Sequence, residues 1–243
     1  MAAEDDYRTT LVAVATYNEI ENLPALVEAI QQALPGADVL VVDDNSPDGT
    51  GRWCDERAER DPRLRVIHRE GKLGLGSATI AAFNWGLDRG YELIATMDAD
   101  WSHDPAVLPA LVALSESCDV AIGSRYCPGG EIAGWPASRR VASAVMNRLT
   151  RLLLRVPARD ASGAFRVYRA EALRRIDLSQ ITESGYAYLE EILWRLHHAG
   201  ATIGEAPITF RDRRAGDSKV SSKEIFGKLR MLRRFGLRRP GRG

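Results

Sequence analysis

The chain has 243 residues, and its 33 basic and 33 acidic side chains give a formal net charge of zero. This length suffices for one large α/β domain or two small ones, and the balanced charge argues against a nucleic-acid-binding protein. The three cysteines, Cys54, Cys118 and Cys127, are odd in number and lack metal-binding spacing. They favour a reducing, cytosolic compartment over a secreted disulfide framework.

Apolar runs alternate with amphipathic segments along the chain. Runs typical of buried strands occupy residues 11–15, 39–42, 64–67, 93–97, 119–122 and 202–208. Helical spacing is found at 23–30, 53–58, in a segment that ends at 87, and at 107–114, 138–155 and 188–197. Strands that are apolar on both faces and alternate with helices indicate right-handed βαβ units. The sequence therefore predicts the α/β class with a mostly parallel central sheet and no interdomain linker.

Two carboxylates follow the strand predicted at 93–97. Asp98 and Asp100 are separated by one residue, and side chains at i and i+2 of a strand project to the same side. Such a pair repels itself unless a cation lies between, and hard oxygen ligands suit Mg²⁺ or Mn²⁺. A solvated turn carrying two acids is the alternative. Polar clusters also follow the first two strands, at the edge where parallel sheets bind ligands.

The glycine-rich stretch at 71–77 resembles a phosphate-binding loop only superficially. A dinucleotide fingerprint follows the first strand of its unit, whereas these glycines follow the third. The sequence also lacks a GxxxxGK[ST] motif. We therefore disfavour an NAD-dependent oxidoreductase and a P-loop protein.

Candidate anion-binding groups follow the strand at 119–122. Arg125 lies just beyond the strand end and can pair bidentately with a phosphate, although a surface salt bridge is the alternative. Arg139 and Ser143 lie one turn apart on the predicted helix 138–155, so both can reach one anion. The same helix carries an apolar stripe that a core-facing helix explains equally well; its residues are Val141, Val145, Leu149 and Leu152.

The C-terminal part of the chain is basic. The loop at 209–219 is of a kind that closes over phosphates and excludes water. In the tail, Ile225, Leu229 and Leu232 form one stripe among basic residues, which is typical of an interfacial helix at an anionic membrane. RNA binding and disorder are the alternatives. No signal peptide and no segment of roughly 18–20 apolar residues is present, so we expect a soluble or peripheral protein.

Six motifs together resemble the polyprenol- and dolichol-phosphate mannosyltransferases, which are inverting enzymes of glycosyltransferase family 2 with the GT-A fold. The motifs are TYNEIENL (16–23), VVDDNSPDGT (41–50), GKLGLGSA (71–78), MDADWSHDP (97–105), GSRYCPGG (123–130) and ASGAFRVYR (161–169). The resemblance covers about residues 9–235 in order. Two departures are Ala15, where relatives often carry proline, and the ASGAF form at 161–165.

The resemblance implies a role for each matching residue. Asp98, Asp100 and Arg125 would be catalytic, and Asp98, Asp100 and Ser102 would bind Mg²⁺ or Mn²⁺ on the donor diphosphate. Arg125, Arg139 and Ser143 would receive the acceptor phosphate. Arg213 and Lys219 would neutralise the diphosphate. The full donor-binding set is Ala15, Tyr17, Glu19, Val41, Asp43, Asp98, Ala99, Asp100, Arg213 and Lys219.

The resemblance further implies the reaction and its place. Mannose would pass from GDP-mannose to polyprenyl phosphate, catalysed by a GT-A domain over residues 1–220. The basic tail at 221–243 would contact the membrane at its cytoplasmic face, with a membrane-integral protein as a further partner and no nucleic acid. UDP-glucose or a non-lipid acceptor is the alternative, followed by a non-catalytic nucleotide-sugar-binding scaffold. A phosphate monoester is already anionic near neutral pH, so the acceptor needs positioning more than a general base.

Overall fold

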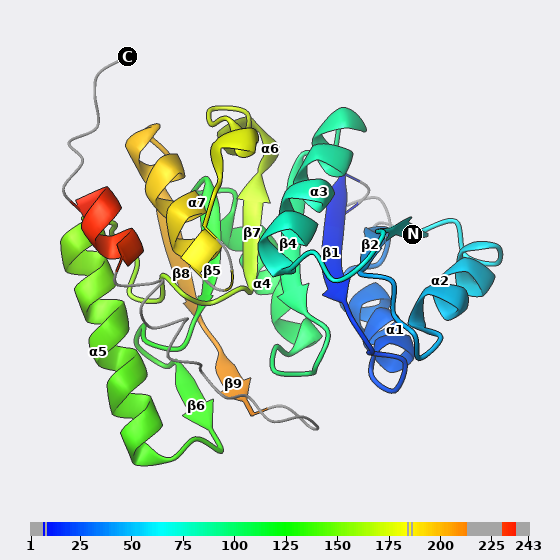
Figure 1. Cartoon of the computed structure of the whole chain (residues 1–243), viewed down its shortest axis with the longest axis horizontal. Coiled ribbons are helices and arrows are strands. Elements are labelled where there is room, and N and C mark those ends of the chain that lie inside the picture. Colours follow the sequence, from blue (N-terminus) through cyan, green and yellow to red (C-terminus); the bar gives the residue numbers. More distant parts are fainter. Residues whose placement is uncertain (1–6, 8, 184, 186, 213–229, 237–243) are drawn as a thin grey trace.

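The computed structural model describes residues 7, 9–183, 185, 187–212 and 230–236. A seven-stranded sheet forms its centre (Figure 1). In spatial order the strands are β3 (Leu64–His68), β2 (Asp38–Asp43), β1 (Thr10–Thr16), β4 (Leu93–Asp98), β7 (Arg166–Arg169), β5 (Val120–Ser124) and β8 (Ile203–Pro207).

The sheet is mostly parallel, as the sequence predicts. Parallel pairing joins β1 to β2 and β4, β2 to β3, and β5 to β8. The exception is β7, which lies antiparallel between β4 and β5. The strand predicted at 202–208 is β8, whereas the first residues of the loop predicted at 209–219 are a strand outside the large sheet. They form β9 (Thr209–Arg211), which pairs with β6 (Glu131–Ala133) in a second small sheet.

Helices cover both faces of the large sheet (Figure 1). Residues of β1 alternate between two apolar clusters, with Leu11 and Ala13 in one and Val12 and Val14 in the other. This burial on both faces explains why the strand runs contain so few polar residues. The helices are α1 (Leu23–Ala33), α2 (Thr50–Ala58), α3 (Leu75–Asp88), α4 (Leu108–Leu114), α5 (Ala137–Leu154), α6 (Ala170–Leu173) and α7 (Ala187–His198), with 3-10 turns η1 (Pro105–Val107) and η2 (Leu178–Gln180).

The apolar stripe of α5 faces solvent. Val141, Val145, Leu149, Leu152 and Leu153 are between 38% and 63% exposed. The face that packs on the domain consists instead of Asn147, Thr150 and Leu154. The core-facing interpretation of the stripe is therefore wrong, because the core side of this helix is partly polar.

The described part of the C-terminal tail packs on the domain. Residues 230–236 are helical, and Met231, Leu232 and Phe235 belong to the same apolar cluster as α3 and α7. The rings of Trp194 and Phe235 are 4.8 Å apart. Leu232 is therefore a core residue and not part of a membrane-facing stripe. Ile225, Leu229 and the predicted domain boundary at 220 lie outside the described residues.

Candidate functional site

The carboxyl ends of β1, β2 and β4 meet at one edge of the sheet. The register places Thr16 beside Asp43 and Ala15 beside Asp98. Ligands of open α/β sheets bind outside the carboxyl ends of the strands. The polar residues that follow these strands therefore share one site, as the sequence predicts.

Asp43 and Val41, two predicted donor residues, are buried at the end of β2. Asp43 is 1% exposed, and its carboxylate accepts hydrogen bonds from Thr16 Oγ1 at 2.9 Å, Ser46 N at 3.0 Å and Ser46 Oγ at 2.5 Å. Val41 is fully buried in the apolar core. In this structure Asp43 fixes the loop after β2 and Val41 belongs to the core. Their predicted contacts with the nucleoside stay predictions.

Tyr17 and Glu19 remain accessible at the same edge. Tyr17 is 37% exposed, and Lys72 Nζ lies 4.1 Å from the centre of its ring. Glu19 is half-buried and accepts a hydrogen bond from Asn22 Nδ2 at 2.9 Å. Asp48 holds this loop, since its Oδ2 accepts from Ile20 N at 3.1 Å. Both residues lie at the edge where the sequence predicts the nucleoside, and that contact stays a prediction.

The metal candidates lie in a tight turn after β4. Burial increases along this turn from Asp98 through Asp100 to Ser102, which is only 1% exposed. Trp101 has a φ of 62°, a left-handed conformation that reverses the chain. Ser102 N then donates to Asp100 Oδ1 at 3.1 Å. The predicted donor residue Ala99 is buried within this turn.

The donor set fits a hard divalent cation bound together with a ligand. Ser102 Oγ is buried and has no hydrogen-bond partner among the described residues, so a free oxygen stands beside the two carboxylates. The part of the chain that the structure describes holds no group of three or more His, Cys, Asp or Glu side chains suited to a metal. Mg²⁺ and Mn²⁺ accept such incomplete protein shells because phosphate and water oxygens supply the remaining ligands.

His103 stabilises the backbone of this turn. Its Nδ1 accepts the backbone N–H of Asp98 at 3.1 Å, so the neutral ring carries its proton on Nε2. Burial lowers the pKa of His103, against the opposing effect of Asp98 and Asp100. The ring stacks on Phe165, with centroids 5.0 Å apart. His103 therefore acts as a neutral structural residue.

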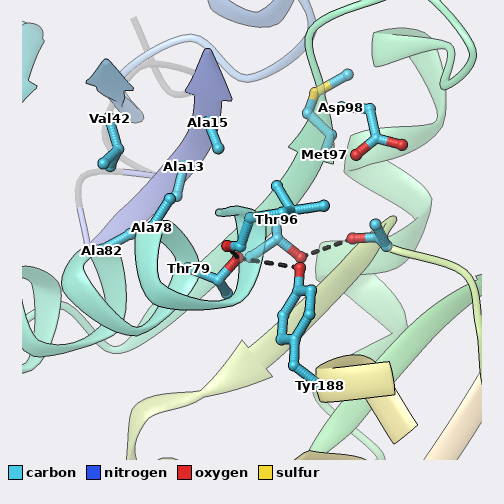
Figure 2. A pocket seen from close by; sticks show the side chains of 12 residues that line it. Ala13, Ala15, Val42, Ala78, Thr79, Ala82, Thr96, Met97, Asp98 and Tyr188 are labelled. Carbon is cyan, nitrogen blue, oxygen red and sulfur yellow. Dashed lines mark hydrogen bonds between the residues drawn. The ribbon is translucent and has the colours of Figure 1, made fainter. Parts of the chain in front are cut away.

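A small cavity lies beside Asp98 at the end of β4. Its volume is about 10 Å³, enough for roughly one water molecule. Figure 2 shows Ala15 and Asp98 on its wall, with Tyr188 below. The Tyr188 hydroxyl and Thr79 Oγ1 are 3.0 Å apart. Ala15, which is half-buried, thus lines the cavity.

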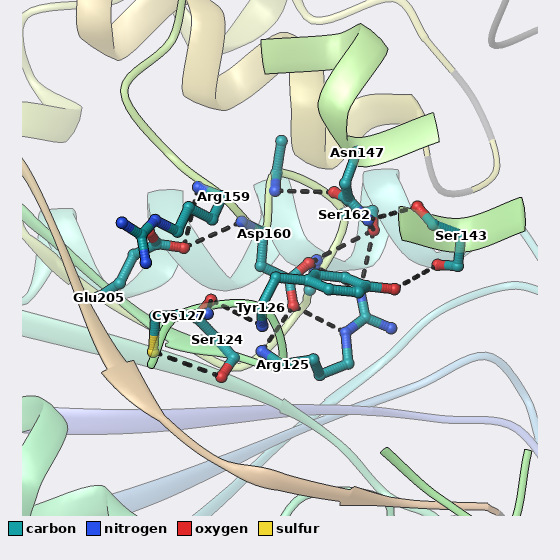
Figure 3. Close-up of polar contacts among 12 residues, drawn as sticks. Ser124, Arg125, Tyr126, Cys127, Ser143, Asn147, Arg159, Asp160, Ser162 and Glu205 are labelled. Carbon is teal, nitrogen blue, oxygen red and sulfur yellow. Dashed lines mark hydrogen bonds and ion pairs between the residues drawn. The ribbon is translucent and has the colours of Figure 1, made fainter. Parts of the chain in front are cut away.

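Arg125 forms a bidentate ion pair with the buried carboxylate of Asp160. Its Nε and Nη2 each lie 2.7 Å from an oxygen of Asp160, and Nη2 also donates to Ser162 Oγ at 2.9 Å (Figure 3). Asp160 is 0% exposed. Although burial raises the pKa of Asp160, the Arg125 guanidinium holds it below the usual value. The bidentate fork that was predicted to bind phosphate is therefore occupied by Asp160.

The second anion candidates lie on α5. Ser143 Oγ accepts a hydrogen bond from the Tyr126 hydroxyl at 2.7 Å (Figure 3). The Arg139 guanidinium stacks 3.9 Å from the Trp135 ring centre and lies 3.5 Å from Asp212. Arg139 and Ser143 are one turn apart, as predicted, and each has a partner that fixes it.

A groove of about 530 Å³ lies between the loop after β5 and α5. Gly130 allows the loop to fold back, since a Cβ there would lie 2.5 Å from the Ser124 carbonyl oxygen. The groove carries Arg140, which the sequence analysis did not single out, beside Arg125. Its lining residues are Arg125, Tyr126, Gly130, Glu131, Ile132, Arg140, Val141 and Ala144.

Sequence reasoning missed Asp160, Tyr126 and Arg140, and two of its predicted residues cannot be placed. Asp160 is 35 residues from Arg125 in the chain, and no spacing rule announces so distant a pair. Arg213 and Lys219 lie outside the described residues. Within the described ranges, no helix has the length and hydropathy of a membrane span.

Comparison with known proteins places these residues in context. A family model described as Glycosyl transferase family 2 matches residues 11–177. The undecaprenyl-phosphate mannosyltransferase of Micrococcus luteus is 44% identical over 227 residues, covering 93% of either chain. The polyprenol monophosphomannose synthase of Mycolicibacterium smegmatis is 46% identical over 231 residues, covering 94% of this chain and 87% of the relative.

Solved structures share the fold. Glucosyl-3-phosphoglycerate synthase from Mycobacterium tuberculosis, in complex with Mn²⁺ and UDP-glucose, has a TM-score of 0.64 at 19% identity, covering 95% of this chain and 81% of that chain. A mannosyltransferase from Pyrobaculum calidifontis, in complex with GDP-Man and Mn²⁺, has a TM-score of 0.57 at 18% identity, covering 90% of this chain and 61% of that chain.

Proposed function

The chain belongs to glycosyl transferase family 2, and from this premise we propose that it transfers mannose from GDP-mannose to polyprenyl phosphate. The observation that carries the proposal is the match to two relatives named for this acceptor class and sugar, at 44% and 46% identity over more than nine-tenths of the chain. The accessible Tyr17 and Glu19 and the acid pair after β4 supply the donor side of such a site.

A divalent ion would be held by Asp98, Asp100 and Ser102. Their oxygen donors suit Mg²⁺ or Mn²⁺ equally, and the ion supplies positive charge where the diphosphate leaves. His103 keeps the backbone at Asp98 in place through its Nδ1. Because Nδ1 accepts the Asp98 N–H and Nε2 carries the proton, His103 offers no basic nitrogen to the acceptor and is not the base of the reaction.

The acceptor phosphate oxygen would attack C1 of mannose while the bond from C1 to the GDP oxygen breaks. A single displacement inverts the sugar and gives β-mannosyl phosphoryl polyprenol and GDP. The acceptor has a second pKa of about 6, so near neutral pH its oxygen needs no proton acceptor. The protein's contribution is therefore orientation and charge.

Arginines on two elements would bind the acceptor phosphate. The side-chain hydrogen bonds of Arg125 within the described residues use Nε and Nη2, and Arg125 lines the groove, so Nη1 would be the nitrogen that binds the phosphate. Arg139 and Ser143 stand on α5, and Arg140 lines the groove itself. Tyr126 orients Ser143 through the hydroxyl bond of 2.7 Å.

We place a membrane contact on α5. The contact predicted for the tail at 221–243 stays a prediction, because most of the tail lies outside the described residues. The exposed stripe Val141, Val145, Leu149 and Leu152 is flanked by Arg140, Arg148, Arg151 and Arg155. An apolar face bordered by arginines is complementary to an anionic bilayer surface. Val141 belongs to both the stripe and the groove, so a lipid-borne phosphate would enter from the membrane. The cytoplasmic face and a membrane-integral partner remain predictions from sequence.

Radiolabel transfer tests the reaction. The purified chain is incubated with GDP-[14C]mannose or UDP-[14C]glucose, polyprenyl phosphate in detergent, and Mn²⁺ or Mg²⁺. We expect label from GDP-mannose in the organic-extractable fraction and none after addition of EDTA. Label from UDP-glucose, or in a water-soluble product, would support the same-fold alternative. Tight donor binding without transfer would support the scaffold alternative and overturn the proposal.

A further inference from the structure

We propose that Lys72 recognises the nucleotide base of the donor and selects a base that presents carbonyl oxygen acceptors, guanine above all. The inference rests on the proposed function, because it concerns the donor of that reaction. It assigns the loop between β3 and α3 to the binding site, although this loop carries none of the metal or acceptor residues.

The position of Lys72 is the first argument. Tyr17 follows β1 directly, whereas Lys72 comes from the loop after β3. Since β2 lies between these two strands, the two loops meet across its carboxyl end. Lys72 Nζ lies 4.1 Å from the Tyr17 ring centre. A base that stacks on Tyr17 therefore comes within reach of this ammonium group.

The backbone of the loop is fixed although its lysine is exposed. Asp44 Oδ2 accepts the N–H of Leu73 at 3.1 Å and of Gly74 at 3.3 Å. Arg69 Nε donates to the other oxygen of Asp44 at 2.6 Å, and both of these side chains are 8% exposed. The buried Asp44–Arg69 pair thus fixes the backbone beside Lys72, and the freedom of the ammonium group comes from the flexible side chain of Lys72.

The contact between Lys72 and Tyr17 is weak enough to be replaced by a contact with a base. An exposed cation–π interaction favours the contacting over the separated arrangement of the two side chains by about two- to five-fold. A hydrogen bond from a charged donor to a carbonyl oxygen is worth about ten-fold or more. When a base with such an oxygen arrives, moving Nζ from the ring face to the base is therefore favourable.

The hydrogen-bonding groups on the edge of the base determine which nucleotide gains affinity from Lys72. Guanine presents O6 and N7, two acceptors on one edge, whereas adenine presents an amino donor beside N7. An ammonium group has donors only, so it favours guanine and opposes the adenine amino group. Glu19 supplies an acceptor in the same site for the amino group of guanine. The pair of opposite charges matches guanine better than adenine.

Binding of GDP, UDP and ADP to the full chain in saturating Mn²⁺, measured by isothermal titration calorimetry, tests the inference. For Lys72→Met we expect about ten-fold weaker binding of GDP and less than about two-fold change for ADP. Lys72→Arg keeps charge and donors and should retain most of the selectivity. Arg89→Met is the matched control, because Arg89 makes a similar contact, 4.0 Å from the Trp85 ring, beyond the other end of α3.

Two results would overturn the inference. An equal loss for GDP and ADP would show that Lys72 attracts the phosphates in general, and no loss would show that it does not contact the nucleotide. Neither result affects transfer of mannose, so the proposed function would stand. If the wild type prefers UDP to GDP and Lys72→Met weakens UDP alone, the proposed donor is wrong while recognition of a base carbonyl by Lys72 is upheld.

Discussion

Charging the exposed stripe of α5 should release the protein from anionic membranes. The double variant Val145→Glu/Leu152→Glu places two acids on the face that we assign to the bilayer. These residues are 51% and 63% exposed, so the substitutions leave the packed side of the helix intact. The expected effect is on membrane binding and not on folding.

The magnitude follows from the exposed fractions. Complete burial of a Val or Leu side chain is worth about 1.5–3 kcal/mol, so burying the exposed parts of these two contributes about 2–3 kcal/mol together. Each acid near an anionic leaflet adds a penalty of about 1 kcal/mol. The total of about 4 kcal/mol corresponds to a loss of roughly three orders of magnitude in the partition coefficient.

Co-sedimentation with vesicles of phosphatidylglycerol and phosphatidylcholine measures this loss. Leu73→Glu is the matched control, because Leu73 is also 63% exposed but lies in the loop after β3, at the opposite end of the sheet order from β5 and β8. We expect the control to bind as wild type does. Wild-type binding by the double variant, with unchanged thermal unfolding, would refute the assignment of α5 to the membrane.

Three further outcomes can be measured directly. Asp98→Asn should lower transfer by roughly two orders of magnitude or more and abolish the Mn²⁺ dependence of GDP binding; unchanged calorimetric titrations would reject the metal assignment. Ellman's reagent at pH 8 should label Cys127 in the native protein and all 3 cysteines after unfolding, because Cys54 and Cys118 are buried away from the reagent whereas Cys127 is half-buried. Burial raises the pKa of all three thiols, that of Cys54 to about 12. Although partial burial raises the pKa of Asp119, hydrogen bonds from Thr202 and Arg175 hold it below the usual value. Asp119→Asn should therefore destabilise the protein at neutral pH, and its difference from wild type in urea unfolding should vanish as the pH falls through that lowered pKa.

Patterns that repeat locally were sufficient to predict the sheet. The alternation of apolar strands and helices follows from burial on both faces, and it fixed the shared edge at which Thr16, Asp43 and Asp98 end their strands. The antiparallel strand β7 was not predictable in its place, because the sequence position of Arg166–Arg169 does not show that it inserts between β4 and β5. Such an insertion depends on long-range packing.

Predicting which polar groups are free was harder than predicting where they lie. Asp43 was placed correctly at the edge, yet Thr16 and Ser46 occupy its oxygens. Leu232 has the spacing of an amphipathic tail, yet the domain buries it. In both cases the partner is distant in sequence, or set by a turn, so periodicity alone does not reveal whether a group meets solvent, ligand or protein.

The pairing of Arg125 with Asp160 gives a prediction that distinguishes two contributions of Arg125 to acceptor binding, the orientation of its guanidinium and its positive charge. Two nitrogens of Arg125 bind the two oxygens of Asp160 at 2.7 Å. A lysine offers one ammonium group, which cannot span both oxygens and also face the groove. Arg125→Lys should therefore raise the KM for polyprenyl phosphate nearly as much as Arg125→Met, while the Kd for GDP stays unchanged.

Stability measurements on the same pair complete the test. Asp160 is 0% exposed, and removing one partner of a buried ion pair costs about 3–5 kcal/mol, since the other charge is left uncompensated. Asp160→Ala should therefore lower the free energy of unfolding by about that amount, whereas Arg125→Met/Asp160→Ala should cost well below the sum of the single changes. Additive losses in urea unfolding, together with a normal acceptor KM for Arg125→Lys, would mean that Asp160 does not hold Arg125 for the acceptor. The acceptor phosphate would then depend on the cations of α5 alone, because Arg140 lines the groove from that helix and Arg139 lies beside it in the chain, neither with help from Asp160.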